Sequence, residues 1–244
     1  MKRLFISAII MMAFALNASA QLAPGKFSLQ FKIGVSGSSF SNSTDINVGQ
    51  LQDLFIHLNG LPSNILDTTL EDEGAGGGTI GVDLEYQAAK WLGLSVGVGY
   101  LTQGTGWDSF KFKQDGTKYR INEPKARLGY LTVPVIANFY VYKGLALKSG
   151  VQFGFLTDAE IMTNVIASGN KEHMHMDLQH GIKSNFENFD IAIPVGVSCE
   201  FGNLLVLDLR YNAGLKKVNK TYNIDGKDNK NRSLVFTLGY KLKL

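Results

Sequence analysis

The sequence predicts an all-β protein, an eight-stranded antiparallel transmembrane β-barrel with up-and-down topology. Three observations predict it: eight segments in which apolar and polar residues alternate, short and long connections that take turns between them, and an export signal at the start of the chain. A period of two residues places the apolar side chains on one face of a strand. Behind an export signal, this repeat is typical of barrels that cross a membrane.

The first twenty residues have the three parts of an export signal. Lys2 and Arg3 are positive, an apolar run follows, and Ala18-Ser19-Ala20 forms a small-x-small cleavage site. The run is too short for a spanning helix, which needs about 20 residues. We therefore expect residues 1–20 to be a signal peptide and residues 21–244 to be one barrel domain.

The bulk composition excludes several classes of protein. Without Lys2 and Arg3, the chain carries 22 Lys and Arg against 21 Asp and Glu, so its charge is nearly balanced. This balance gives no reason to expect a nucleic-acid partner. A single cysteine, Cys199, excludes an internal disulfide.

The eight alternating segments each supply about the ten residues that a tilted spanning strand requires. They are residues 27–35, 80–87, 92–100, 130–141, 145–155, 189–201, 205–212 and 234–244. Long loops are expected at 36–78, 103–127, 157–187 and 214–232. Barrels of this kind have short turns on the periplasmic side, so both termini are expected there. Pro134 and Pro194 fall inside segments, and we expect a β-bulge at each because proline lacks a ladder donor.

The polar faces of the segments predict how the barrel is filled. They combine many glycines with charges of both signs, which suit the narrow interior of an eight-stranded barrel. A charge on the lipid face near the midplane would cost about 2–4 kcal/mol. The predicted interior ion network consists of Lys32, Asp83, Glu85, Lys148, Asp190, Glu200, Asp208, Arg210 and Lys241. The alternative is a soluble lipocalin-type barrel with its apolar faces inward, which would expose a glycine-rich surface.

Three stretches carry a resemblance to a known family. Gly129-Tyr130-Leu131-Thr132-Val133-Pro134-Val135 resembles a Tyr-Leu-x-x-Pro strand, residues 207–215 resemble an Asp-x-Arg-Tyr-x-x-Gly strand, and Leu238-Gly239-Tyr240 resembles a final strand. Together they are similar to the PorT-like outer-membrane β-barrel family, which has an OmpA-like eight-stranded barrel. The resemblance implies the fold and an outer-membrane location. It also implies, for one type of member, assistance to protein secretion.

The candidate binding residues lie in the expected loops. His173, His175 and His180 are close in sequence, and imidazoles beside methionine suit soft metals such as copper. The alternative is a solvated loop with no metal. The apolar residues Leu51, Leu54, Phe55 and Leu58 have helical spacing, which fits either a helix folded onto the barrel rim or a patch for a partner.

Catalysis is not expected. No histidine falls in a predicted strand, and His57 stands alone in its loop, so no Ser-His-acid set is indicated. We expect a non-enzymatic outer-membrane protein without a cofactor, with a structural or loop-mediated role that includes accessory help to secretion. Its expected partners are outer-membrane lipid and a secretion-machinery component or another outer-membrane protein. The alternatives are a small pore or ligand-binding barrel and, behind these, a lipid-modifying enzyme.

Overall fold

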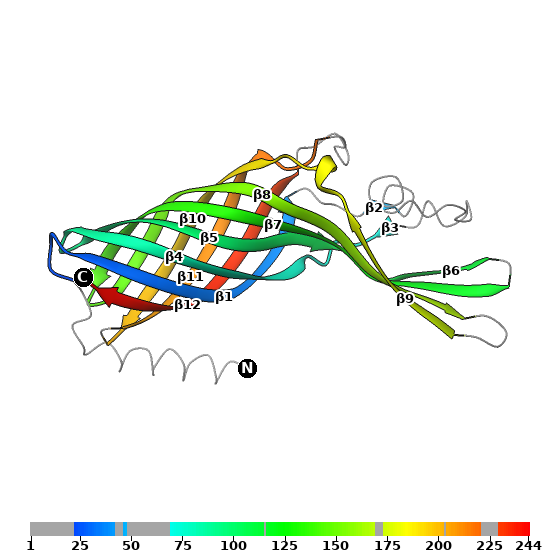
Figure 1. The fold of residues 1–244 in the computed structure, drawn as a ribbon, viewed down its shortest axis with the longest axis horizontal. Coiled ribbons are helices and arrows are strands. Elements are labelled where there is room, and N and C mark those ends of the chain that lie inside the picture. The colour runs from blue at the N-terminus through cyan, green and yellow to red at the C-terminus, as the bar shows by residue number, and fades with distance from the viewer. Residues whose placement is uncertain are drawn as a thin grey trace.

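The protein is a closed ring of eight long antiparallel strands (Figure 1). The structure, a computed structural model, describes residues 22–41, 46–47, 69–114, 116–168, 173–202, 204–220 and 229–244. The ring strands are β1 (Phe27–Ser41), β4 (Ala75–Ala89), β5 (Leu92–Gly106), β7 (Thr117–Tyr142), β8 (Leu145–Ser168), β10 (Phe189–Phe201), β11 (Leu205–Lys217) and β12 (Lys230–Lys243). Each pairs with the next in this order, and β12 pairs with β1 to close the ring. The predicted antiparallel up-and-down barrel is therefore confirmed.

The apolar faces of the ring strands point outward. Ile33 and Val35 are 62% exposed on the outer surface, whereas Lys32, the residue before Ile33, is 7% exposed and lies inside. The same alternation holds along β12, where exposed Leu234 and Phe236 flank buried Val235. This arrangement suits a lipid environment and excludes the lipocalin-type alternative.

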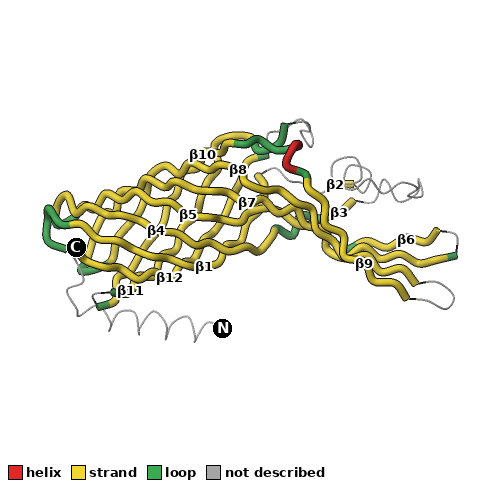
Figure 2. Tube along the Cα trace, viewed as in Figure 1, coloured by secondary structure: helices red, strands yellow, loops and turns green. Residues whose placement is uncertain are grey.

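The two ends of the barrel differ. The turn end carries the short connections that follow β4, β7 and β10, together with the chain terminus after β12 (Figure 1). At the opposite end, which we call the loop end, β7 and β8 continue beyond the ring. There they pair with the edge strands β6 (Phe110–Gln114) and β9 (His173–Gly181). We call β6, β9, residues 117–122 of β7 and residues 160–168 of β8 the projecting sheet (Figure 2).

The predicted loops at 103–127 and 157–187 are therefore wrong in large part. Most of these residues are strand, because β7 and β8 keep pairing with each other far beyond the apolar belt. The sequence contains the signal for the first hairpin: Phe110-Lys111-Phe112-Lys113 and Lys118-Tyr119-Arg120-Ile121 alternate on either side of an Asp-Gly pair. An Asp-Gly turn between alternating segments favours a β-hairpin.

The predicted bulges at the two prolines are also wrong. Pro134 has no partner on β5 but pairs with Gln152 of β8, and the register on both sides is unbroken. Pro194 has no partner on β8 but pairs with Asn212 of β11, again without a shift. A missing N–H removes bonds on one side of a strand only, so flanking pairs and the other neighbour hold the register.

A bulge does occur in β7 where the barrel gives way to the projecting sheet. The register between β7 and β8 shifts between Asn122 and Lys125, and Glu123 has a φ of 37°. Lys125 Nζ lies 2.7 Å from Glu123 Oε2 and lowers the pKa of that carboxyl group. Because of the shift, β7 buries odd-numbered residues such as Ile121 on the projecting-sheet side of the bulge and even-numbered residues such as Leu128 on the barrel side.

An apolar core fills the loop end. Trp107, Ile121, Leu128 and Phe186 are all at most 2% exposed and belong to one cluster, against which Val165 of the projecting sheet packs. The remaining described elements are the short strands β2 (Ile46–Asn47) and β3 (Thr69–Leu70) and a 3-10 turn at Lys183–Asn185. Within the described ranges, no helix is long and apolar enough to cross a membrane. The predicted signal peptide and the predicted helical stripe from Leu51 to Leu58 lie outside the described residues.

Candidate functional site: the filled lumen and the projecting sheet

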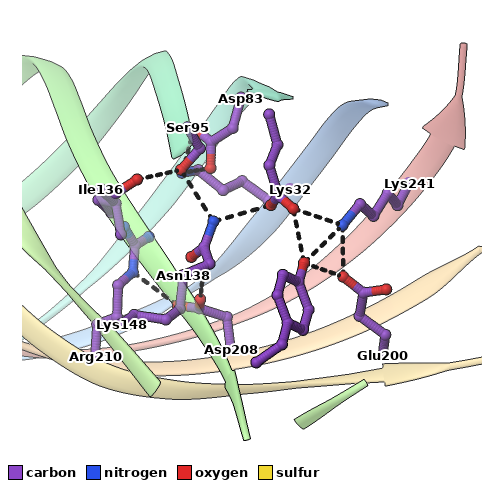
Figure 3. A network of polar contacts seen from close by, with 12 residues as sticks. Lys32, Asp83, Ser95, Ile136, Asn138, Lys148, Glu200, Asp208, Arg210 and Lys241 are labelled. Carbon is purple, nitrogen blue, oxygen red and sulfur yellow. Dashed lines mark hydrogen bonds and ion pairs between the residues drawn. The ribbon is translucent and has the colours of Figure 1, made fainter. Parts of the chain in front are cut away.

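Four side chains near the turn-end termini of their strands meet across the lumen, and Figure 3 labels two of them, Glu200 and Lys241. Lys241 Nζ lies 2.5 Å from Glu200 Oε1 and 3.3 Å from Glu85 Oε1. The hydroxyl oxygen of Tyr140 lies 2.7 Å from each of the same two carboxylate oxygens and accepts a hydrogen bond from Lys241 at 3.1 Å. We call Glu85, Tyr140, Glu200 and Lys241 the lumen cluster.

The lumen cluster spans the barrel interior, because its members come from every second strand of the ring. Glu85 is on β4, Tyr140 on β7, Glu200 on β10 and Lys241 on β12. All four are at most 8% exposed. Asn138 extends the cluster by donating a hydrogen bond from Nδ2 to Glu85 Oε2 at 2.9 Å. The contacts therefore run from wall to wall of the lumen.

Further ion pairs fill the middle of the lumen (Figure 3). Lys32 Nζ lies 2.5 Å from Asp83 Oδ2. Asp208 is shared, because Lys148 pairs with one of its oxygens and Arg210 Nε lies 2.7 Å from the other. Charges buried in this way are tolerated because each faces an opposite charge at short range.

Glycine leaves the room that these charges need. A Cβ atom at Gly97 would overlap the carboxylate of Asp83, and one at Gly196 would come within 2.7 Å of Arg210 Cγ. The glycines on the polar faces thus admit long charged side chains to a narrow lumen, as the composition of those faces indicates.

Eight of the nine residues predicted for the interior network lie in these ion pairs. Asp190 differs. Its carboxylate accepts hydrogen bonds from Asn231 Nδ2 at 2.8 Å and from the N–H of Ile191 at 2.8 Å. Asn231 also donates to the hydroxyl oxygen of Tyr130 at 3.1 Å. The expected ion pair is replaced by amide donors, which satisfy a buried carboxylate without a cation.

Sequence reasoning missed the neutral members of the network. Tyr140 and Asn138 lie on the inward face of their strand, but only the charged residues were singled out as a network. The available signal was their position on the inward face of the strand. In a narrow barrel, a large polar side chain on that face must contact the charged side chains around it.

No histidine lies among the ring residues described, and no group of three His, Cys, Asp or Glu suited to a metal occurs in the described part of the chain. The backbones of His173, His175 and His180 lie in β9, but their side chains fall outside the description. His57 falls outside it altogether.

The projecting sheet has two chemically distinct faces at its β6–β7 hairpin. Phe110 and Ile121 are buried on one face, which packs onto the loop-end core. Lys111, Lys113, Lys118 and Arg120 are exposed on the other. We call these four residues the basic face.

A closed eight-stranded ring, an apolar outer belt and a charged, filled lumen define a small outer-membrane β-barrel. The family model for the outer membrane protein beta-barrel domain matches residues 19–220, and the chain belongs to that family. Its place in the outer membrane follows from that membership.

Solved structures of similar barrels include two bacterial proteins. One is Ail, the attachment invasion locus protein of Yersinia pestis, at 13% identity, covering 90% of this chain and 99% of that one with a TM-score of 0.39. Another is Neisserial surface protein A, at 13% identity, covering 89% and 97% with a TM-score of 0.38. No curated protein matches the chain.

Proposed function

We propose that this protein is a non-conducting, non-enzymatic outer-membrane barrel whose role is to hold the projecting sheet outside the cell as a binding surface. The observation that carries the proposal is the lumen cluster, which joins every second strand across the lumen with buried ion pairs. A barrel of eight strands is only wide enough for side chains, and here those side chains contact one another. This disfavours the pore.

The orientation supports a role outside the cell. Barrels of this kind keep short turns in the periplasm and longer extensions outside. On that rule the turn end and both termini are periplasmic, and the projecting sheet extends from the cell surface. The lipid of the outer membrane surrounds the apolar belt.

The partner is expected at the projecting sheet because this part of the protein extends beyond what membrane insertion requires. The resemblance to the PorT-like family makes a secretion-machinery component one candidate, and another outer-membrane protein is a second. The soft-metal role of His173, His175 and His180 stays a hypothesis, which a copper titration followed by the histidine ring signals in NMR would test.

Planar-bilayer recording tests the closed lumen. The native protein is expected to give no steady conductance at any holding potential. A triple variant, Glu85→Ala, Tyr140→Ala and Lys241→Ala, removes three sides of the lumen cluster and is expected to pass ions, which shows that the assay detects an open barrel. Steady channels from the native protein would overturn the proposal.

Surface cross-linking tests the binding role. The full-length protein is cross-linked on intact cells beside a variant in which residues 109–122 are replaced by a two-residue Asn-Gly turn. A partner captured by the native protein and lost from the variant supports the proposal, and secretion components among those captured would establish the accessory role. Equal capture by both proteins would contradict a role for the projecting sheet.

A further inference from the structure

The basic face is a compact array of four cations. Lys111 pairs with Arg120 and Lys113 pairs with Lys118 across the two strands of the β6–β7 hairpin. Residues two apart along a strand are separated by about 6.6 Å, and neighbouring strands by about 4.8 Å. The four side chains therefore leave the sheet from the corners of a small rectangle. They line a shallow groove together with Ile166 and Ser168 of β8 and with Phe112 and Tyr119, which alternate with the cations along the hairpin.

Folding alone gives no reason for this arrangement. Like charges directly opposite each other across two strands are destabilising. In the described part of the chain none of the four cations has an ion pair, whereas nearby Lys125 is paired with Glu123. The stability of the hairpin comes instead from its other face, where the rings of Phe112 and Tyr119 stack with centroids 4.9 Å apart.

The basic face also lies well away from the lipid. Leu131 is the last large apolar side chain on the outer face of β7 before the loop end, and it is 42% exposed. Arg120 lies eleven residues earlier in β7, which is about 35 Å of extended strand toward the tip of the projecting sheet. Lipid headgroups bound at the barrel rim would not reach the four cations at that distance.

We propose that the basic face binds an extended anionic polysaccharide that carries sulfate or carboxylate groups. The proposal deepens the proposed function, on which it rests, by naming the class of partner. A linear polymer with anionic groups several ångströms apart matches an unpaired rectangle of cations outside the membrane. A nucleic acid fits less well, because strand alternation directs Phe112 and Tyr119 to the other face, where their rings stack on each other rather than on bases.

Binding of purified full-length protein in detergent to immobilised dextran sulfate tests the proposal. Neutral dextran of the same length and vesicles containing phosphatidylglycerol are the comparison probes. The native protein is expected to bind dextran sulfate and neither of the others, and the binding should weaken as salt is raised because exposed charges are screened. Each cation is expected to contribute about fivefold to the affinity.

Two charge-matched variants decide whether the site or the net charge is responsible. Lys111→Gln, Lys113→Gln, Lys118→Gln and Arg120→Gln together are expected to weaken binding by about 600-fold, which is fivefold for each of the four cations. Lys26→Gln, Lys90→Gln, Lys143→Gln and Lys243→Gln together remove the same charge at the turn end and are expected to change affinity less than about twofold. A difference in electrophoretic mobility between heated and unheated samples confirms that the barrels of both quadruple variants still fold.

Several results would overturn the polysaccharide site. They are no binding of native protein to dextran sulfate, equal losses in both quadruple variants, or stronger binding to the phosphatidylglycerol vesicles. None of them bears on the closed lumen or on partner capture by the projecting sheet, so the proposed function would fail or stand by its own two experiments.

Discussion

The barrel and the loop end place the same kinds of residue on opposite sides. In the barrel, Ile33 is 62% exposed and Lys32 is buried in the lumen. In the projecting sheet, Ile121 is 1% exposed and Lys111 is exposed. β7 and β8 run from one region into the other, with a bulge at Glu123 of β7 that changes which residues face inward.

The surrounding medium explains why the barrel buries charged side chains and the projecting sheet buries apolar ones. Lipid accepts apolar side chains and leaves charges to pair inside, whereas water accepts charges and leaves apolar side chains to pack inside. The lumen accordingly holds ion pairs such as Lys32 with Asp83, and the loop end holds a core around Trp107. Stability should therefore depend on buried ion pairs in the barrel and on buried apolar volume at the loop end. Four substitutions test this difference.

The largest effect is expected from breaking the lumen cluster. Lys241→Met leaves the carboxylates of Glu85 and Glu200 without their shared cation and should lower the free energy of unfolding by about 3–5 kcal/mol. Guanidinium unfolding in detergent, followed by tryptophan fluorescence, measures it. Adding Glu200→Gln to Lys241→Met should recover part of the loss. Unaltered stability in the single variant would mean that the ion pairs do not hold the barrel.

The loop-end core should respond to the loss of apolar volume. Ile121→Ala is expected to cost about 2–5 kcal/mol, because a cavity is left in a packed core. The effect should be local: limited proteolysis should cleave the projecting sheet while the barrel keeps its heat-modified gel mobility. Faster cleavage inside the barrel would contradict the separation of the two regions.

A charged side chain on the outer face of the barrel should lower stability, because that face meets lipid. The exposed charges of the projecting sheet meet water instead. Val96 is 48% exposed on the outer face of β5, and Val96→Arg is expected to cost about 2–4 kcal/mol in a bilayer. Unfolding titrations in vesicles check this. Val96→Leu is the control and should change little. A tolerated arginine would show that this face does not meet lipid.

The smallest effect is expected from filling the lumen. Gly97→Ala forces a methyl group against Asp83 and should cost about 1–3 kcal/mol by overpacking. Gly76→Ala is the matched control, because a Cβ there meets nothing within 4 Å. Guanidinium midpoints of the two variants give the comparison. Equal midpoints would show that the lumen has room to spare.

Seven of the eight predicted spanning segments lie within an observed strand, and both ends of the sixth, Phe189 and Phe201, were predicted to the residue. The eighth was predicted to end at Leu244, and its strand β12 ends one residue earlier, at Lys243. The prediction of the strands succeeded because lipid on one side and a narrow lumen on the other impose a strict period of two on the sequence. The same rule indicated which charges point inward. It gave no information about which of them meet, and Asp190 contacts Asn231 where a cation was expected.

The extensions of β7 and β8 into the projecting sheet were missed because apolar residues face outward in the membrane but inward beyond it. Beyond Glu123 the register shifts by one residue, so the face that had been inward continues on residues of the other parity. Alternation persists at Phe110-Lys111-Phe112-Lys113, but its meaning is reversed, because the apolar residues now face a core.

The sequence by itself determined the strand count, the faces of the strands and the class of environment, because these depend only on local alternation and on length. Tertiary structure alone decided which distant residues meet. Closing the ring brings Glu85 and Lys241, 156 positions apart, across one lumen. Pairing β6 with β7 sets Lys111 beside Arg120, and such pairings depend on register, which no single segment contains.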